Sequence, residues 1–123
     1  MKVDELKKRV ENLPRYQFII LSGGSLVMHG LREETQDVDI CVSDTLAKDL
    51  GIFGKEPNEK GYYELPNGMD VMVGMEKINS ELVGDYLCQR LEDILKFKKA
   101  RNLPKDQQDI YKIEECLAQQ GHS

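Results

Sequence analysis

Hydrophobic and polar residues follow two periods along the chain, one typical of helices and one typical of strands. Residues 3–13 carry apolar side chains at three- and four-residue steps, which predicts a short helix that Pro14 ends. Residues 16–21, YQFIIL, form an apolar run typical of a strand buried on both faces. A brief helix with a glycine at its end is expected over residues 25–31. Residues 37–43, DVDICVS, alternate strictly and predict a second strand.

The middle of the chain predicts a further helix and a hairpin. Asp44 is expected to cap a short helix over residues 44–50. Residues 61–74, GYYELPNGMDVMVG, contain two strand-like runs on either side of the turn sequence PNG, which is a hairpin signal.

Helical patterns dominate the sequence from residue 80 to residue 120. A break is expected near Asn102–Pro104, with the next helix starting around Lys105. The complete order is helix, strand, helix, strand, helix, hairpin and helices. This order predicts an α/β (α+β) fold in which a small mixed β-sheet is flanked by helices.

Composition narrows the class of protein. With 123 residues the chain is expected to form a single domain over residues 1–123. A net charge of −5 argues against a broad electrostatic grip on nucleic acid. There is no apolar run long enough for a membrane span, and the N-terminal residues do not resemble a secretory signal, so a cytoplasmic protein is expected. The three cysteines fit neither a disulfide framework nor a zinc site.

Paired aspartates are the strongest chemical signal. Asp37 and Asp39 share one face of their predicted strand, with Cβ atoms about 6–7 Å apart. Without a counter-charge, such carboxylates raise each other's pKa. Asp70, in MDVMV, has the same alternation. The strand at 37–43 is expected to lie beside the strands at 16–21 and 69–74, so that the three carboxylates converge. Three carboxylates suit Mg²⁺ (or Mn²⁺) and the two-metal chemistry of phosphoryl compounds.

Other patterns that contain two nearby aspartates fit this sequence less well. An EF-hand starting at Asp37 would need a glycine at Val42 and a glutamate at Lys48. GIFGK is too short for a P-loop. A phosphoaspartyl hydrolase places its aspartates after an apolar strand, whereas EETQ precedes this pair. The plain alternative is a half-solvated strand whose aspartates have no chemical role.

Residues 21–30, LSGGSLVMHG, put two glycines and a serine directly after an apolar run. Glycine lets another backbone or a ligand come close, and Ser25 offers a helix N-cap. The stretch fits either a plain turn or a cradle for phosphate. For His29, a structural role is favoured over a catalytic one.

Taken together, these features resemble the nucleotidyltransferase superfamily, which has the DNA polymerase β-type catalytic fold. Its signature is a strand, a Gly-Gly or Gly-Ser pair, a spacer and D-x-D, followed by a later carboxylate; SGGS, DVDI and Asp70 follow that order. The closest likeness is to small bacterial AbiEii-like and uncharacterised nucleotidyltransferases, on the residues HGLREETQDVDI and KDQQDI. The resemblance spans roughly residues 16–118.

The resemblance implies roles for the matching residues. The metal ligands and catalytic residues would be Asp37, Asp39 and Asp70, with Asp70 as third ligand or general base. The nucleotide-binding residues would be Gly23, Gly24, Ser25, Lys98 (or Lys96) and Asp106. In this scheme the glycines hold phosphates through backbone N–H groups, and Asp106 holds the lysine or the base. The catalytic core would cover residues 16–75, followed by C-terminal helices over residues 80–120.

The activity implied is transfer of a nucleoside monophosphate from a nucleoside triphosphate (NTP) to a hydroxyl acceptor. Two alternatives stay open: a degenerate binding or antitoxin-like protein, and a metal-dependent phosphohydrolase. Antitoxin-type minimal members usually have Ser before D-x-D, where this chain has Gln36, although all three aspartates are present. The chain ends soon after the expected core, so a homodimer or partner protein is expected to complete the acceptor site. Protein, RNA and small-molecule acceptors remain open.

Overall fold

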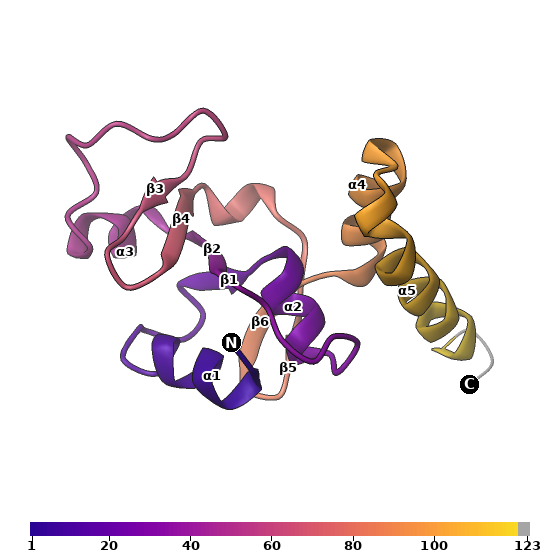
Figure 1. Cartoon of the computed structure of the whole chain (residues 1–123). Helices are drawn as coiled ribbons and strands as arrows, with labels where there is room; N and C mark the ends of the chain where they lie inside the picture. Colours follow the sequence, from indigo (N-terminus) through magenta and orange to yellow (C-terminus); the bar gives the residue numbers. More distant parts are fainter. Residues whose placement is uncertain (121–123) are drawn as a thin grey trace.

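A six-stranded mixed sheet forms the centre of the computed structural model, which describes residues 1–120 (Figure 1). The strands are β1 (Phe18–Ile20), β2 (Val38–Val42), β3 (Tyr63–Glu64), β4 (Met69–Val73), β5 (Ser80–Val83) and β6 (Tyr86–Gln89). Their order across the sheet is β3-β4-β2-β1-β6-β5. β2 runs parallel to β4 and antiparallel to β1, and β1 runs parallel to β6. This arrangement confirms the predicted fold class and the predicted neighbours of β2.

Helices flank the sheet, and two of them form a separate pair beside it. The helices are α1 (Val3–Val10), α2 (Ser22–Met28), α3 (Asp44–Asp49), α4 (Leu91–Arg101) and α5 (Gln107–Gln120). Two 3₁₀ turns are η1 (Met75–Lys77) and η2 (Pro104–Asp106). α4 and α5 pack against each other at one side of the molecule, away from α1 and α3 (Figure 1).

The two faces of the sheet differ in how completely they are covered. The main core packs strand residues such as Ile20, Ile40 and Val71 against Leu6 of α1 and Leu46 of α3. On the opposite face, Ile19, Leu21 and Cys41 are buried, but their apolar neighbours are only partly covered: Tyr62, Met72, Met75, Ile78 and Leu87. Because side chains alternate along a strand, Asp39 shares this second face with Cys41, and Asp70 shares it with Met72.

A third apolar cluster attaches the α4–α5 pair to the rest of the chain. It joins Leu26 of α2 to Leu91 and Ile94 of α4 and to Ile113 of α5. All four side chains are almost fully buried. Burial of side chains of this size contributes roughly 1.5–3 kcal/mol each, which fixes α4 beside α2.

The expected helical run over residues 80–120 was wrong in its first ten residues. Residues 80–89 form the β5–β6 hairpin, and helix begins only at Leu91. In the structure Tyr86 and Cys88 are buried while Leu87 and Gln89 are partly exposed, but the consecutive apolar residues Tyr86, Leu87 and Cys88 hide this alternation in the sequence. Gly84 makes the turn with φ +62°. The hairpin extends the sheet beyond β1 and supplies two strands that the sequence analysis did not predict.

Several element boundaries also differ from the expectation. α2 begins at Ser22 rather than at residue 25. Ser43, not Asp44, caps α3, where its Oγ accepts a hydrogen bond from Leu46 N at 3.1 Å. β1 is shorter than residues 16–21 because Tyr16 adopts φ 71°, which a strand does not accommodate.

Candidate active site

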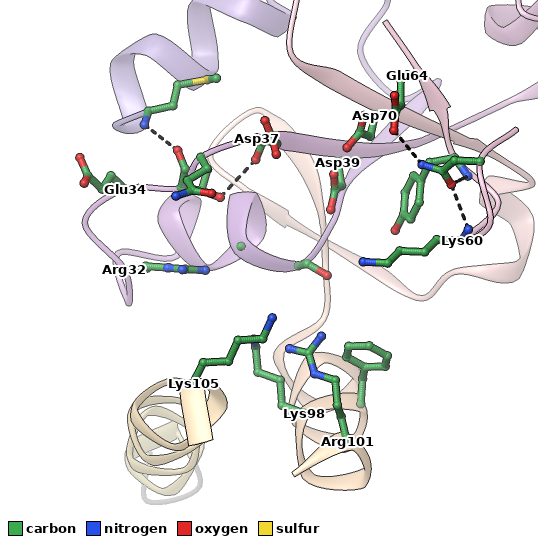
Figure 2. A pocket seen from close by; sticks show the side chains of 18 of the residues that line it. Arg32, Glu34, Asp37, Asp39, Lys60, Glu64, Asp70, Lys98, Arg101 and Lys105 are labelled. Atoms are coloured by element: carbon green, nitrogen blue, oxygen red, sulfur yellow. Dashed lines mark hydrogen bonds between the residues drawn. The ribbon is translucent and has the colours of Figure 1, made fainter. Parts of the chain in front are cut away.

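A cleft of about 930 Å³ lies between the second face of the sheet and the α4–α5 pair (Figure 2). Acidic side chains line its sheet side, and basic side chains project from α4 and η2 on the other side (Figure 2). The acidic residues are Glu34, Asp37, Asp39, Glu59, Glu64 and Asp70. The basic residues are Arg32, Lys60, Lys98, Arg101 and Lys105. Lys98, Arg101 and Lys105 thus face the acidic residues from the helical side, whereas Arg32 and Lys60 come from loops on the sheet side.

The strand register brings two of the predicted aspartates together. Asp39 of β2 and Asp70 of β4 are direct partners on neighbouring parallel strands, as expected from the sequence. Neighbouring strands lie about 4.8 Å apart, so both carboxylates project from one small area of the sheet. Asp37 stands just before β2, is exposed, and lines the same cleft. All three aspartates thus face one cavity.

The electrostatics of the pair show uncompensated negative charge. Burial, the charges of Asp70 and Asp37, and a hydrogen bond shared with Asp70 raise the pKa of Asp39 to about 6. The pKa of Asp70 is also raised, by burial and by the charges of Asp37 and Glu64. Lys60 opposes both shifts without cancelling them. A positively charged ligand at this point would relieve the repulsion.

The donor set fits a hard divalent cation, although the three aspartates do not form a closed site. Within residues 1–120, no three His, Cys, Asp or Glu side chains are gathered closely enough to hold a metal ion by themselves. The groups that face the cleft from β2 and β4 are carboxylate oxygens, which Mg²⁺ prefers, and Mg²⁺ commonly takes one or two carboxylates plus substrate phosphates. An open pair of carboxylates is compatible with that mode of binding.

Lys98, which the resemblance made a nucleotide-binding residue, lines the cleft from α4. Its side chain is almost completely buried, with 7% of the residue exposed, and its Nζ lies 3.4 Å from Asp106 Oδ1 and 3.4 Å from Asp109 Oδ2. The alternative, Lys96, is exposed and does not line the cleft. A buried ammonium needs such partners, because an unpaired charge away from water is costly.

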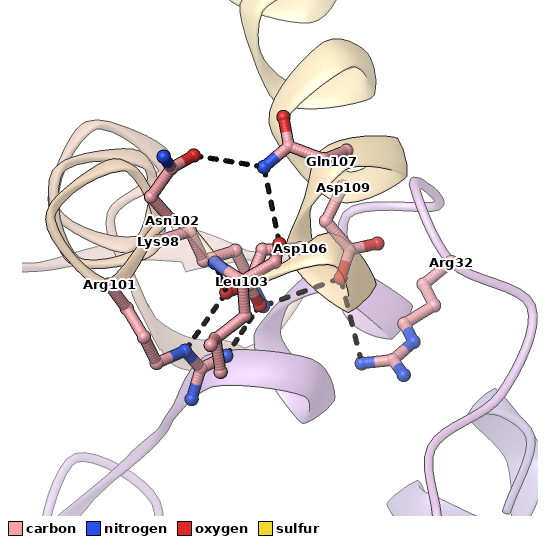
Figure 3. Close-up of polar contacts among 8 residues, drawn as sticks. All are labelled: Arg32, Lys98, Arg101, Asn102, Leu103, Asp106, Gln107 and Asp109. Atoms are coloured by element: carbon pink, nitrogen blue, oxygen red, sulfur yellow. Dashed lines mark hydrogen bonds and ion pairs between the residues drawn. The ribbon is translucent and has the colours of Figure 1, made fainter.

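Asp106 organises the basic wall through a second cation (Figure 3). Arg101 Nε donates to Asp106 Oδ2 at 2.9 Å, and Leu103 N donates to the same oxygen at 3.3 Å. The hydrogen bonds from Arg101 hold the pKa of Asp106 far below its usual range. The expectation that Asp106 holds the lysine is therefore met in the geometry, and Asp106 holds Arg101 as well.

Arg32 connects this network to the loop that follows α2. Its Nη1 lies 3.9 Å from Oδ2 of Asp109, which belongs to α5 (Figure 3). The sequence analysis missed Arg32, Lys60, Arg101 and Lys105. Arg32 lies inside HGLREET, Lys105 is the first residue of KDQQDI, and Arg101 lies four residues before it, so membership of or proximity to the recognised motifs was the available signal.

Only one residue of the predicted Gly-Gly-Ser cradle reaches the cleft. Gly23 lines it, and a Cβ at this position would lie 2.9 Å from both Arg32 Nη1 and Thr35 Oγ1. Gly24 is buried, and a Cβ there would lie 2.9 Å from Ile20 Cγ2. The close approach that Gly24 permits is therefore to the core, and its role in holding phosphate stays a prediction. Gly24 allows α2 to pack closely on the sheet.

Ser25 also points away from the cleft. It is 0% exposed, and its Oγ donates to the backbone oxygen of Gln89 at 2.8 Å. Ser22 instead lines the cleft, and it adopts φ 45°, a conformation that non-glycine residues rarely adopt. The expectation that Ser25 begins the helix was wrong, since the chain turns into α2 three residues earlier.

His29 has a structural position, as the sequence favoured. Its Nδ1 lies 2.8 Å from Ser25 O, and its Nε2 lies 2.8 Å from Glu81 Oε1. These contacts tie the end of α2 to β5, and His29 does not line the cleft.

In the part of the chain that the structure describes, no helix is long and apolar enough to cross a membrane.

A mixed sheet with facing aspartates on neighbouring parallel strands, opposite a basic helical wall, defines the nucleotidyltransferase class. The chain belongs to the family described as "Nucleotidyltransferase of unknown function (DUF6036)", whose model matches residues 1–120. No curated protein and no solved structure gives a match. The superfamily predicted from the sequence is thereby confirmed, whereas the closer likeness to AbiEii-like proteins stays a prediction.

Proposed function

We propose that the protein transfers a nucleoside monophosphate from an NTP to a hydroxyl group of an acceptor. The observation that carries this proposal is the opposition of Asp39 and Asp70 to Lys98 and Arg101 across one cleft. A triphosphate carries negative charge along its length, and Arg and Lys side chains are the usual groups that bind it. The family description supports the class of reaction.

The reaction forms one bond and breaks one. The acceptor hydroxyl oxygen bonds to the α-phosphorus, and the bond from that phosphorus to the oxygen bridging the β-phosphate breaks. Pyrophosphate leaves, and the hydroxyl proton passes to a base. Asp70 is our candidate for that base, because its carboxylate lines the cleft beside Asp39.

Mg²⁺ or Mn²⁺ is the proposed cofactor, held by Asp39 and Asp70 with Asp37 at the edge of the cleft. When bound, the cation neutralises charge that develops on the phosphates. Lys98 and Arg101 would hold the triphosphate from the opposite wall. Gly23 belongs to the proposed phosphate site because its backbone lines the cleft. Any residue with a side chain in place of Gly23 would crowd Arg32.

A second copy of the chain or a partner protein is proposed to complete the site that binds the acceptor. A cytoplasmic location and a single domain over residues 1–123 belong to the same proposal, whereas a catalytically degenerate, antitoxin-like protein is the alternative to it. Protein, RNA and small-molecule hydroxyls are the acceptor classes to be compared.

A transfer assay with differently labelled nucleotides tests the proposal. The chain is incubated with Mg²⁺ or Mn²⁺, with each of the four NTPs labelled at the α- or γ-phosphate, and with separate protein, RNA and small-molecule fractions. We expect the α-label, and not the γ-label, to move to one acceptor fraction, with release of pyrophosphate. Asp39→Asn and Asp70→Asn should abolish transfer, whereas Asp49→Asn, an exposed site on α3, should retain it. Release of orthophosphate without α-label transfer would instead support a phosphohydrolase.

A further inference from the structure

A second, smaller hollow of about 160 Å³ adjoins the cleft. Its apolar walls come from the sheet side and from α4: Leu21, Met72, Ile78 and Ile94. Its remaining lining residues are Ser22, Tyr62, Gln89 and Phe97. Ser22, Tyr62 and Phe97 also line the charged cleft, so the two spaces are continuous. We refer to this hollow as the apolar recess.

We propose that the apolar recess binds the base of the nucleotide, an inference that rests on the proposed function. A nucleobase has two apolar faces and a polar edge, and it stacks readily on aromatic rings. The recess offers two aromatic side chains, Tyr62 and Phe97, together with aliphatic walls. A site with these contents, opening directly into a phosphate-binding cleft, matches the two chemically different halves of a nucleotide.

Phe97 is placed to serve as the stacking surface. Its residue is 54% exposed, which is unusual for a phenylalanine next to apolar neighbours and leaves a ring face available to a ligand. The guanidinium of Arg101 lies 5.0 Å from the centre of the same ring. Ile94, Phe97, Lys98 and Arg101 follow the spacing of one helix face, so a single face of α4 supplies both the recess wall and the phosphate-binding cations.

Gln89 adds a polar group to the otherwise apolar lining. Its Oε1 accepts a hydrogen bond from Ser22 N at 3.0 Å, which fixes the orientation of the amide. Its Nε2 has no hydrogen-bond partner among residues 1–120 and is a free donor. Ring nitrogens and carbonyl oxygens of bases are acceptors, so this donor suits the polar edge of a base. Ser22 Oγ likewise has no partner in the described chain.

Comparing a whole nucleotide with inorganic tripolyphosphate separates the recess from the phosphate site. Calorimetry in Mg²⁺ would measure the Kd of ATP and of tripolyphosphate for the wild type and for Phe97→Ala. Loss of one stacking contact is expected to weaken ATP binding about tenfold, with tripolyphosphate binding unchanged. Phe53→Ala is the matched control, because Phe53 is similarly exposed and lines neither space. It should leave both values unchanged.

A second measurement needs no variant. The triphosphate of 2-aminopurine riboside is fluorescent, and stacking on an aromatic ring is expected to quench it on binding to the wild type. Equal affinities for ATP and tripolyphosphate, or an equal loss of both in Phe97→Ala, would overturn the recess proposal and leave the phosphate site standing. Unquenched fluorescence in the bound state would also overturn it. If neither ATP nor tripolyphosphate binds the wild type, the proposed function itself fails.

Discussion

Asp39 is the residue at which function and stability conflict most clearly. It is held beside Asp70 and near Asp37, and these charges and partial burial raise its pKa to about 6. A carboxyl group with a raised native pKa binds its proton more tightly in the folded state than in the unfolded state. Its contribution to stability therefore falls as the pH rises from about 4 to about 6 and stays unfavourable above that range.

Asp39→Asn should accordingly stabilise the protein in the absence of divalent cations. At pH 7.5, with chelator present, we expect a gain on the order of 1 kcal/mol after allowance for solvent screening, and a melting temperature higher by a few degrees. The gain should shrink as the pH falls from about 6 toward 4, because the wild-type carboxyl then becomes protonated in the folded state. Thermal unfolding across pH 4–8 measures it. A variant less stable than the wild type at pH 7.5 would show that the charges at Asp39 are compensated.

The adjacent glycines separate packing from ligand binding. Gly24→Ala places a methyl group against Ile20 in the core and should cost about 1–3 kcal/mol of stability, without a direct effect on the nucleotide. Gly23→Ala places the methyl group against Arg32 and Thr35 in the cleft. It should weaken ATP binding while changing the melting temperature less. Calorimetry and thermal unfolding of both variants check this pair, and the reverse pattern would contradict our assignment of the two glycines.

At the residue scale, the sequence predicted the carboxylates better than the cations. Asp39 and Asp70 follow from strand alternation, which is a local rule. Arg101 and Lys105 depend on where α4 and η2 dock, and nothing in their local spacing indicates a shared cleft. The phosphate cradle was predicted one residue too far along the chain. The turn into α2 starts at Ser22, with a positive φ that non-glycine residues seldom adopt.

The α4–η2–α5 unit is held at its bend by one buried carboxylate. Asp106 is 1% exposed and accepts hydrogen bonds from Arg101, Leu103 and Lys98. The helix break was predicted near Asn102–Pro104. In the structure Asn102 ends α4 in the left-handed conformation, with φ 49°. The partners of Asp106 were not all predictable, because Arg101 comes from the last turn of the preceding helix.

Asp106→Asn should lower the melting temperature and weaken triphosphate binding together. The change leaves Arg101 without its carboxylate partner and leaves Lys98 with Asp109 alone, so the orientation of both side chains is less firmly fixed. Since the pKa of Asp106 lies below its usual range, the stability it provides is present above pH 3.8 and is lost only as the pH falls further. The difference from wild type should therefore be constant from pH 8 to about pH 4. Lys99→Ala, at an exposed ion pair on the same helix, is the control. A difference that grows between pH 6 and pH 8 would contradict this assignment.

At the scale of elements, the hairpin at residues 80–89 shows where periodicity misled. Its apolar residues were taken as part of a helical run, although buried and exposed positions alternate through β6. The hairpin matters for the site, because Gln89 at the end of β6 contacts both Ser22 and Ser25. β6, which the sequence analysis missed, thus helps to position Ser22 and Ser25 at the start of α2.

For the whole molecule, the arrangement of the two walls is the central feature. The sheet wall follows from the position of β2 between β1 and β4, which the sequence analysis predicted. The helical wall depends on the cluster of Leu26, Leu91, Ile94 and Ile113, whose members are distant in sequence. Tertiary packing of this kind has no local signature, so the opposition of charges across the cleft emerged only in three dimensions.

The most direct test of that arrangement is a crystal structure with Mn²⁺ and an ATP analogue that cannot be cleaved between the α- and β-phosphates. We predict an anomalous scattering peak for Mn²⁺ beside Asp39 and Asp70, with the triphosphate between the metal and the side chains of Lys98 and Arg101. A metal bound elsewhere, or a triphosphate that contacts neither Lys98 nor Arg101, would contradict the account.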